Sequence, residues 1–194
     1  MEQNDLLQWT VELLERQGLQ YMLVGSVASS YYGLIRSTQD IDFVVRFTLA
    51  QLEAFCGEFS PDDFYVSLPA AREALQRGGQ FNIIHFRSGN KLDIMLPRQD
   101  AWGQQQLSRR RAVSLMTNTS GYVATPEDVI LGKLWYYRDG EHEKHLRDIV
   151  SILQEQQLID HDYLAHWIAQ LGYDDLWSVI KQRLAMPAKE PPRG

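Results

Sequence analysis

The stretch YMLVGSVASSYYGLIRSTQDIDFVV, residues 21–45, decides how the rest of the chain is interpreted. An apolar run leads into the pair Gly25 and Ser26, and a second apolar run carries two aspartates, Asp40 and Asp42. Residues two apart in an extended chain point to the same side, so the two carboxylates are expected to lie side by side. Two ionised carboxylates at that distance repel each other, so either a cation or an arginine must neutralise them or one of them must stay protonated.

A divalent cation is the simplest source of that neutralisation. Oxygen ligands without a histidine or cysteine cluster favour a hard ion, Mg²⁺ first and Mn²⁺ second. The plainer alternative is a strand entrance at which Asp40 and Asp42 are solvated or cap a turn. Gly25 and Ser26 favour the metal, because they follow a strand and begin a helix, where backbone N–H groups and the Ser26 hydroxyl can bind an anion.

Hydrophobic periodicity and turn residues predict alternating helices and strands over the first two thirds of the chain. Helices are expected at residues 4–17 (with Asn4 as N-cap), 26–36, 49–59 and 68–79 and near Trp102, and strands at 19–25, 40–47, 81–86 and 91–96, with two weaker strands within 111–125. The pattern predicts an α/β (α+β) fold class.

The character of the sequence changes at Thr125. Thr125 is suited to cap a helix, Pro126 to begin it, and Asp128 follows three residues after the cap. From Thr125 the sequence predicts successive helices that end before a short tail. We expect a core at 1–124, a helical subdomain packed on it at 125–186, and a disordered tail at 187–194.

Charge, cysteine content and the distribution of apolar residues exclude several classes of protein and of metal site. The chain has 194 residues, a net charge of -6 and a single cysteine, Cys56, so internal disulfides and multi-cysteine metal sites are excluded. The N-terminus lacks a basic, then apolar, secretory pattern, and no apolar run could cross a membrane, so a cytoplasmic protein without membrane contact is predicted. The net charge opposes broad attraction to nucleic acid, and the basic run 108–112 is a solvated rim or a phosphate-contacting patch.

The glycine turn and the paired aspartates resemble the hG[G/S] and Dh[D/E]h motifs of the DNA polymerase beta-like nucleotidyltransferase superfamily. Gly25, Ser26, Asp40 and Asp42 occupy the matching positions, and the resemblance covers about residues 19–96. It implies the nucleotidyltransferase fold, a mixed β-sheet flanked by helices, and a Mg²⁺-dependent enzyme that binds ATP or another NTP.

The family also carries a third carboxylate on a neighbouring strand, and Asp93 in KLDIML is the match. The resemblance implies that Asp40, Asp42 and Asp93 are catalytic and bind two Mg²⁺ ions, with Asp93 nearest the acceptor. Gly25 and Ser26 would then hold the terminal phosphates of the nucleotide.

The helical part resembles the AbiEii-type branch of that superfamily, which includes toxins of toxin–antitoxin systems. In TPEDVILGKLWYYRDG and HLRDIVSIL, Lys133 matches the helix lysine and Asp148 the later acidic position. The resemblance implies that Lys133 contacts the triphosphate and that Asp148 also belongs to the nucleotide-binding residues, and an antitoxin protein is a candidate partner. Arg36 could contact phosphate or acceptor, or form a surface ion pair.

Two functions from different classes follow. The first is transfer of a nucleoside monophosphate from an NTP to a hydroxyl of RNA, protein or a small molecule. The second is a non-catalytic nucleotide- or partner-binding protein of the same fold. His142 and His145 have a spacing that can bind metal on one helix face, but solvated helix residues are the preferred interpretation.

Overall fold

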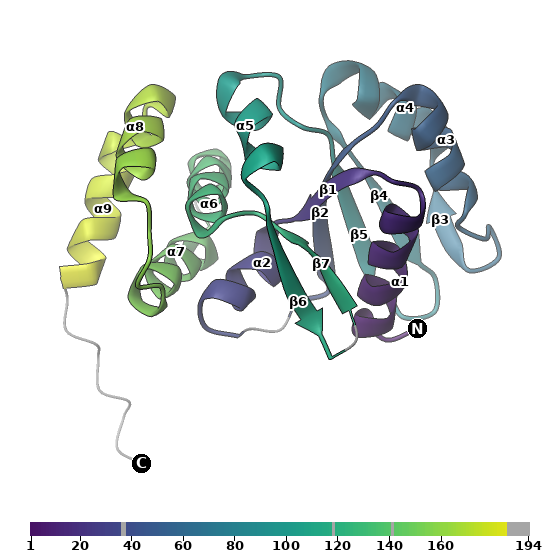
Figure 1. Ribbon diagram of the computed structural model, residues 1–194, viewed down its shortest axis with the longest axis horizontal. Helices are drawn as coiled ribbons and strands as arrows, with labels where there is room; N and C mark the ends of the chain where they lie inside the picture. Colours follow the sequence, from purple (N-terminus) through teal and green to yellow (C-terminus); the bar gives the residue numbers. More distant parts are fainter. Residues whose placement is uncertain (36–37, 118, 141, 186–194) are drawn as a thin grey trace, which may run out of the picture. The chain divides into compact units, whose positions relative to one another are not determined.

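The computed structural model describes residues 1–35, 38–117, 119–140 and 142–185 (Figure 1). Residue contacts divide the chain into two compact units. Unit 1 consists of Met1–Ala28 and Arg36–Thr125, and unit 2 consists of Ser29–Ile35 and Pro126–Gly194. The predicted tail, residues 187–194, lies outside the described residues.

Unit 1 is built on a seven-stranded sheet. Its strands are β1 Gln20–Leu23, β2 Asp40–Arg46, β3 Phe64–Val66, β4 Gln80–His85, β5 Lys91–Met95, β6 Arg111–Met116 and β7 Thr119–Val123. Its helices are α1 Gln3–Arg16, α3 Leu49–Gly57, α4 Leu68–Arg77 and α5 Ala101–Arg109, and α2 Gly25–Tyr32 begins in unit 1 and ends in unit 2. The α/β prediction is confirmed.

The sheet is mixed, with strand order β3-β4-β5-β2-β1-β7-β6. The pairs β2·β5 and β1·β7 are parallel, whereas β1·β2, β3·β4, β4·β5 and β6·β7 are antiparallel. One face of the two central strands is apolar and fully buried: Ile41, Phe43 and Val45 on β2, and Leu92 and Ile94 on β5. The residues between them therefore point to the opposite face.

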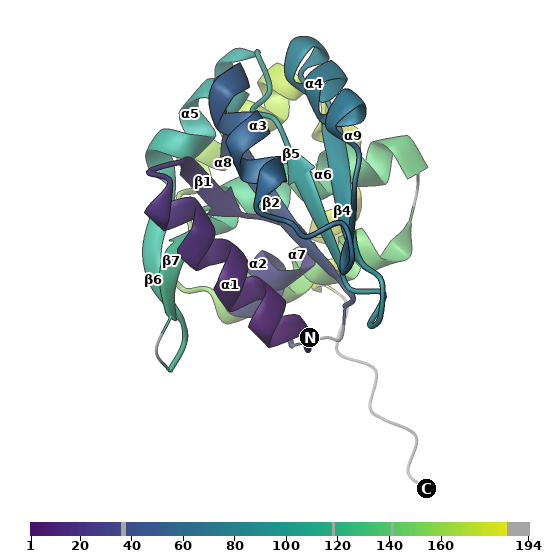
Figure 2. The same cartoon turned by 90° about the vertical axis from the view of Figure 1, so that its right-hand side faces the viewer.

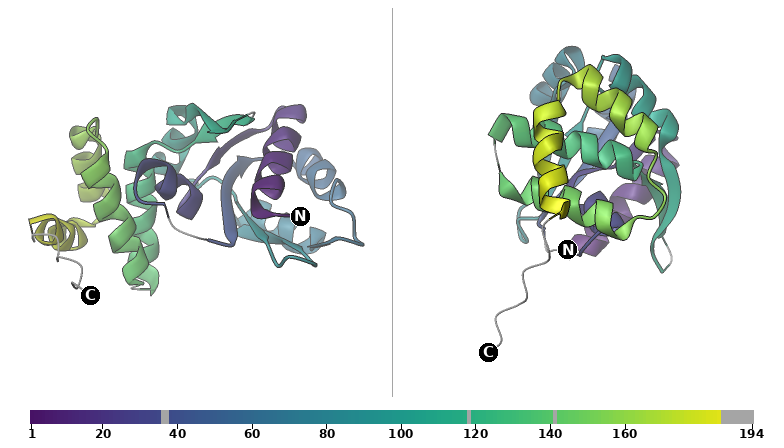
Figure 3. Two further views of the ribbon diagram at one scale, coloured as in Figure 1. Left: turned by 90° about the horizontal axis from the view of Figure 1, so that it is seen from below. Right: turned by 90° about the vertical axis from the view of Figure 1, so that its left-hand side faces the viewer.

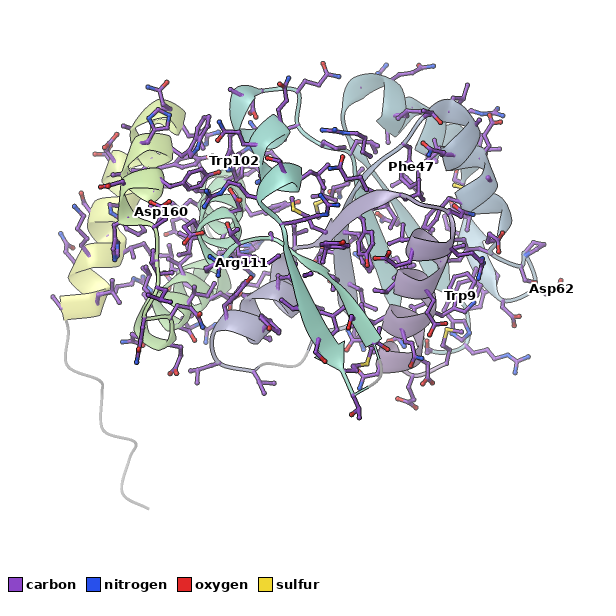
Figure 4. The ribbon with its side chains drawn as sticks, viewed as in Figure 1. Trp9, Phe47, Asp62, Trp102, Arg111 and Asp160 are labelled. Carbon is purple, nitrogen blue, oxygen red and sulfur yellow. The ribbon has the colours of Figure 1, made fainter. Side chains whose placement is uncertain are left out.

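A row of contacting aromatic side chains packs helices α1 and α3 onto the apolar core of unit 1. Trp9 of α1 contacts Phe59 with ring centroids 5.0 Å apart, Phe59 contacts Phe55 at 5.2 Å, and Phe55 contacts Phe47 at 5.3 Å. Figure 4 labels Trp9 and Phe47 at the two ends of this row. Figure 2 shows α1 and α3 in front of the strands that they cover. These helices fix the apolar face, and the other face of β2 and β5 is left for polar residues.

Unit 2 is helical beyond Thr125, with α6 Pro126–Gly140, α7 Glu143–Glu155, α8 His161–Leu171 and α9 Asp174–Ala185. The right-hand view of Figure 3 looks onto these helices, from green α6 to yellow α9. Asp160 caps α8, because its carboxylate accepts the backbone N–H of Tyr163 at 2.9 Å. The Tyr163 hydroxyl donates to Asp128 at 2.8 Å, so the predicted start of α6 is also tied to α8.

The structure differs from the sequence predictions in three local details. Helix α2, predicted over 26–36, ends at Tyr32, because the next residue is Gly33 and glycine is a poor helix former. Helix α1 begins at Gln3 with Glu2 rather than Asn4 as its N-cap, since the Asp5 carboxylate accepts the Glu2 N–H at 3.2 Å. Strand β3 was not predicted, because its three residues are too few to show an alternating pattern.

Candidate functional site

The predicted acidic residues of unit 1 lie on two adjacent parallel strands. Asp42 of β2 is the direct partner of Asp93 on β5, and Asp40 is the partner of Lys91. Directly opposed residues of paired strands share a face of the sheet, so these four side chains project to one side. The Asp93 side chain is 11% exposed, whereas the Asp40 side chain is 49% exposed. The structure thus brings the three predicted carboxylates onto one face.

The glycine turn between β1 and α2 fits closely against Asp42. Gly25 has φ +60°, and a Cβ there would lie 1.9 Å from Asp42 Oδ2, so both the backbone and the space require glycine. The Ser26 N–H donates to the same Oδ2 at 3.4 Å, and the Val24 N–H donates to the Asp42 carbonyl at 2.9 Å. The turn therefore holds the Asp42 carboxylate at the N-terminus of α2, where the helix dipole favours negative charge.

Lys91 neutralises part of the acidic cluster, a role that the sequence analysis missed. Its ammonium lies 2.9 Å from Asp93 Oδ2 and 3.3 Å from Asp40 Oδ1. Burial alone would lower the pKa of Lys91, but the hydrogen bond to Asp93 and the charges of Asp93 and Asp40 raise it above its ordinary value. The signal was present in KLDIML, because Lys91 stands two residues before Asp93 and so shares its face.

One oxygen of the cluster is left without a partner. Asp93 Oδ1 is buried and has no hydrogen-bond partner among the described residues. An unpaired buried carboxylate oxygen is costly, so it calls for a cation or a donor. In the described part of the chain, no three His, Cys, Asp or Glu side chains converge closely enough to hold a metal ion as they stand. The donor set is nevertheless all oxygen and suits a hard divalent ion.

The two predicted nucleotide-side residues of the helical region pair with each other inside unit 2. Lys133 Nζ of α6 lies 2.5 Å from Asp148 Oδ2 of α7, and the two side chains are 4% and 10% exposed. The Ser29 hydroxyl, from the end of α2, donates to the same Oδ2 at 3.5 Å. All three groups of this cluster are buried, whereas in the cluster around Lys91 the Asp40 side chain is 49% exposed.

The remaining candidates lie elsewhere or carry other contacts. Arg36 lies outside the described residues. In the basic run, the Arg110 guanidinium lies 4.4 Å from the centre of the Tyr122 ring, a cation–π contact within unit 1. Burial, followed by the charges of nearby lysines, lowers the pKa of His145 to about 4, and its buried Nδ1 has no hydrogen-bond partner within the described ranges.

A cavity of about 400 Å³ lies in unit 1 away from the carboxylates. It is lined by Arg46, the last residue of β2, and by Leu96 and Arg98, which follow β5. Arg46 lies four positions after Asp42 along β2, about 13 Å at 3.3 Å per residue. The cavity therefore lies at the other ends of the strands that carry the acids.

Comparison with solved structures gives the fold a name. The antibiotic-resistance factor ANT(2'')-Ia superposes on this chain with a TM-score of 0.58 at 10% identity. The superposition covers 92% of this chain and 95% of ANT(2'')-Ia. An antigenic nucleotidyltransferase-like protein from Paracoccidioides brasiliensis superposes with a TM-score of 0.53 at 20% identity. The superposition covers 93% of this chain and 92% of that protein. The chain has the nucleotidyltransferase fold. Lincosamide antibiotic adenylyltransferase LnuA, in a lincomycin-bound structure, shares this nucleotidyltransferase fold over 77% of this chain and 96% of its own, with a TM-score of 0.52 at 15% identity.

The similarity to these nucleotidyltransferases lies in the fold and not in the sequence. No protein-family sequence profile and no curated protein sequence matches the chain. Among the described helices, none is long and apolar enough to span a bilayer.

Proposed function

We propose that the protein is a Mg²⁺-dependent nucleotidyltransferase that moves a nucleoside monophosphate from an NTP to a hydroxyl group. One observation carries the proposal: Asp42 and Asp93 stand directly opposite each other on parallel strands, with an unpaired buried oxygen on Asp93. The glycine turn packed on Asp42 supports it, because Gly25 leaves room for that carboxylate where any side chain would displace it.

Each residue of the cluster has a proposed role. Asp40, Asp42 and Asp93 would hold Mg²⁺, or Mn²⁺ as the second choice. When bound, the metal supplies charge neutralisation for the triphosphate and the departing pyrophosphate, and it polarises the acceptor hydroxyl. Asp93, the most buried of the three, would accept the proton of the acceptor hydroxyl. The N-terminal amides of α2, from Gly25 and Ser26, would bind the terminal phosphates.

The two residues predicted to act from unit 2 have a structural explanation as well. Lys133 and Asp148 form a buried ion pair, and such pairs hold helices in register whether or not a nucleotide binds. Contact between Lys133 and the triphosphate therefore stays a prediction, as does a contact of Arg36 with phosphate or acceptor.

A small-molecule hydroxyl is our first choice for the acceptor. Two neighbours in fold are named for antibiotics: ANT(2'')-Ia is an antibiotic-resistance factor, and LnuA is a lincosamide antibiotic adenylyltransferase. The net charge of -6 opposes a polyanionic acceptor such as RNA. A protein acceptor, with the chain acting as the toxin of an AbiEii-type pair bound to an antitoxin, is the next alternative.

Lys91 favours a second candidate function, a non-catalytic protein of the same fold that binds a nucleotide or a partner. An ammonium that already contacts Asp40 and Asp93 can stabilise the acidic face without a metal. Such a protein would have no requirement for Mg²⁺ and would release no pyrophosphate.

Transfer of label from each α-labelled NTP separates the two functions. The protein is incubated with Mg²⁺ and, in separate reactions, an aminoglycoside, a lincosamide, RNA or a protein extract. We expect one acceptor to gain label with release of pyrophosphate, and Asp93→Asn to lower the rate more than about 100-fold, since losing groups that merely support metal ligands costs ~10–100-fold. If no acceptor gains label and NTP binding does not depend on Mg²⁺, the non-catalytic alternative is supported.

A further inference from the structure

Lys91 occupies the position from which a cation would neutralise the acidic face. Its ammonium contacts one oxygen of Asp93 at 2.9 Å and one of Asp40 at 3.3 Å, so a single side chain joins the two strands. The lysine side chain is 29% exposed, so most of it is covered by its neighbours. The second oxygen of Asp93 is buried and receives no donor from any described residue. Neutralisation by Lys91 is therefore incomplete.

The ammonium and a divalent cation would compete for the negative charge of the same two carboxylates. Mg²⁺ binds carboxylate oxygens at about 2.0–2.1 Å, and the ammonium nitrogen already lies 2.9 Å from one oxygen of Asp93 and 3.3 Å from one of Asp40. A metal ion held by Asp40 and Asp93 would thus lie within a few ångströms of the Lys91 charge. Like charges at that separation repel strongly at a partly buried site.

Displacing the ammonium is feasible because the contact is partly solvated. The Asp40 side chain is 49% exposed, and ion pairs that water can reach contribute only ~0–1 kcal/mol, so the contact with Asp40 is weak. The Asp93 side chain is 11% exposed, so the contact with Asp93 is the stronger of the two. The Lys91 backbone is fixed in β5, opposite Asp40 on β2 and Ile84 on β4. The lysine can therefore leave the carboxylates by rotating its side chain while the strands keep their register.

We infer that Lys91 is an internal counter-ion that holds Asp40 and Asp93 together in the metal-free protein and must be displaced when the divalent cation binds. The inference rests on the proposed metal site and goes beyond it, because it makes metal binding an exchange of one cation for another. Two consequences follow. Lys91 weakens the metal affinity of the protein without nucleotide, and it stabilises the metal-free fold.

Binding of Mn²⁺ in the absence of nucleotide, measured by electron paramagnetic resonance, tests the exchange. We expect Lys91→Met to bind Mn²⁺ about fivefold more tightly than the wild type, the equivalent of ~1 kcal/mol at 1.4 kcal/mol per tenfold. Lys91→Arg keeps the positive charge and should bind as weakly as the wild type. Lys181→Met, which removes the same charge from an exposed position on α9, controls for net charge and should leave the affinity unchanged.

Thermal unfolding in a chelator is the second readout. Without metal, Lys91→Met should melt at a lower temperature than the wild type. Added Mn²⁺ should raise the melting temperature of Lys91→Met more than that of the wild type. If Lys91→Met does not fold without metal, Lys91→Gln provides the same comparison with a polar side chain.

Two results would overturn the inference, and they differ in what else they affect. Unchanged or weaker Mn²⁺ binding in Lys91→Met, with binding lost in Asp93→Asn, would mean that Lys91 supports the metal site instead of competing for it, and the proposed function would stand. Equal Mn²⁺ binding by the wild type and Asp93→Asn would show that the carboxylates hold no metal, and both proposals would fail.

Discussion

Two lysines, Lys133 and Lys91, pair with aspartates through the same chemistry in opposite surroundings. In unit 2, Lys133 and Asp148 are 4% and 10% exposed, and the Ser29 hydroxyl donates to the oxygen that Lys133 contacts. In unit 1, Lys91 and Asp40 are 29% and 49% exposed, and the buried oxygen of Asp93 receives no donor from the described residues.

The difference shows that burial and hydrogen-bond saturation, and not the presence of an ion pair, separate a structural pair from an exchangeable one. A buried pair has already lost its water, so removing either partner leaves a charge that nothing replaces. A partly solvated pair with an unsatisfied oxygen can exchange its cation for another at little cost. The first arrangement suits a fixed helix contact, and the second suits a binding site.

The largest effect should come from breaking the buried pair on one side only. Lys133→Met and Asp148→Asn should each lower the free energy of unfolding by ~3–5 kcal/mol, because each leaves a buried group without its partner. Replacing both, as Lys133→Met with Asp148→Leu, should recover most of that loss. Urea denaturation measures all three variants, and single variants within ~1 kcal/mol of the wild type would contradict a structural role for this pair.

A smaller effect should come from the glycine turn beside the exchangeable cluster. Gly25 and Gly18 have nearly the same left-handed backbone, with φ +60° and +61°, but only Gly25 faces a carboxylate, whereas a Cβ at Gly18 meets nothing within 4 Å. Gly18→Ala should therefore lower the free energy of unfolding by ~1 kcal/mol, the cost of placing a side chain on a left-handed backbone. Gly25→Ala should lower the free energy of unfolding by at least ~1 kcal/mol more than Gly18→Ala, because its methyl group displaces the Asp42 carboxylate.

The two glycine variants also separate stability from binding. Gly25→Ala should lose Mn²⁺ affinity, and Gly18→Ala should keep it, when both are compared by the same titration. Equal losses of stability and equal Mn²⁺ affinities in the two variants would contradict the close packing of Gly25 on Asp42.

The sequence predicted the parts of the site that depend on local spacing. The two-residue spacing of Asp40 and Asp42 and the apolar neighbours of Asp93 were enough to place all three on strands, because alternation along a strand is a local property. The glycine turn was predicted for the same reason. Its packing against Asp42, a residue 17 positions away, could come only from the structure.

The partners of the two lysines depend on tertiary structure. Lys133 and Asp148 were each predicted to serve a nucleotide, and their mutual contact joins two helices, α6 and α7. Lys91 reaches Asp40 only because β2 and β5 run parallel in one particular register. No spacing in the sequence specifies such a register, since the strands are joined through two helices and two other strands.

The central claim is that the acidic face of unit 1 binds a nucleotide through a divalent metal. Calorimetric titration of ATP and the other NTPs into the wild type and Asp42→Asn, with and without Mg²⁺, tests it most directly, since asparagine keeps the shape that packs on Gly25 and removes only the charge. We expect the wild type to bind the nucleotide only with Mg²⁺, and Asp42→Asn to lose this binding. Binding that is equal in the two proteins, or that does not depend on Mg²⁺, would contradict the claim.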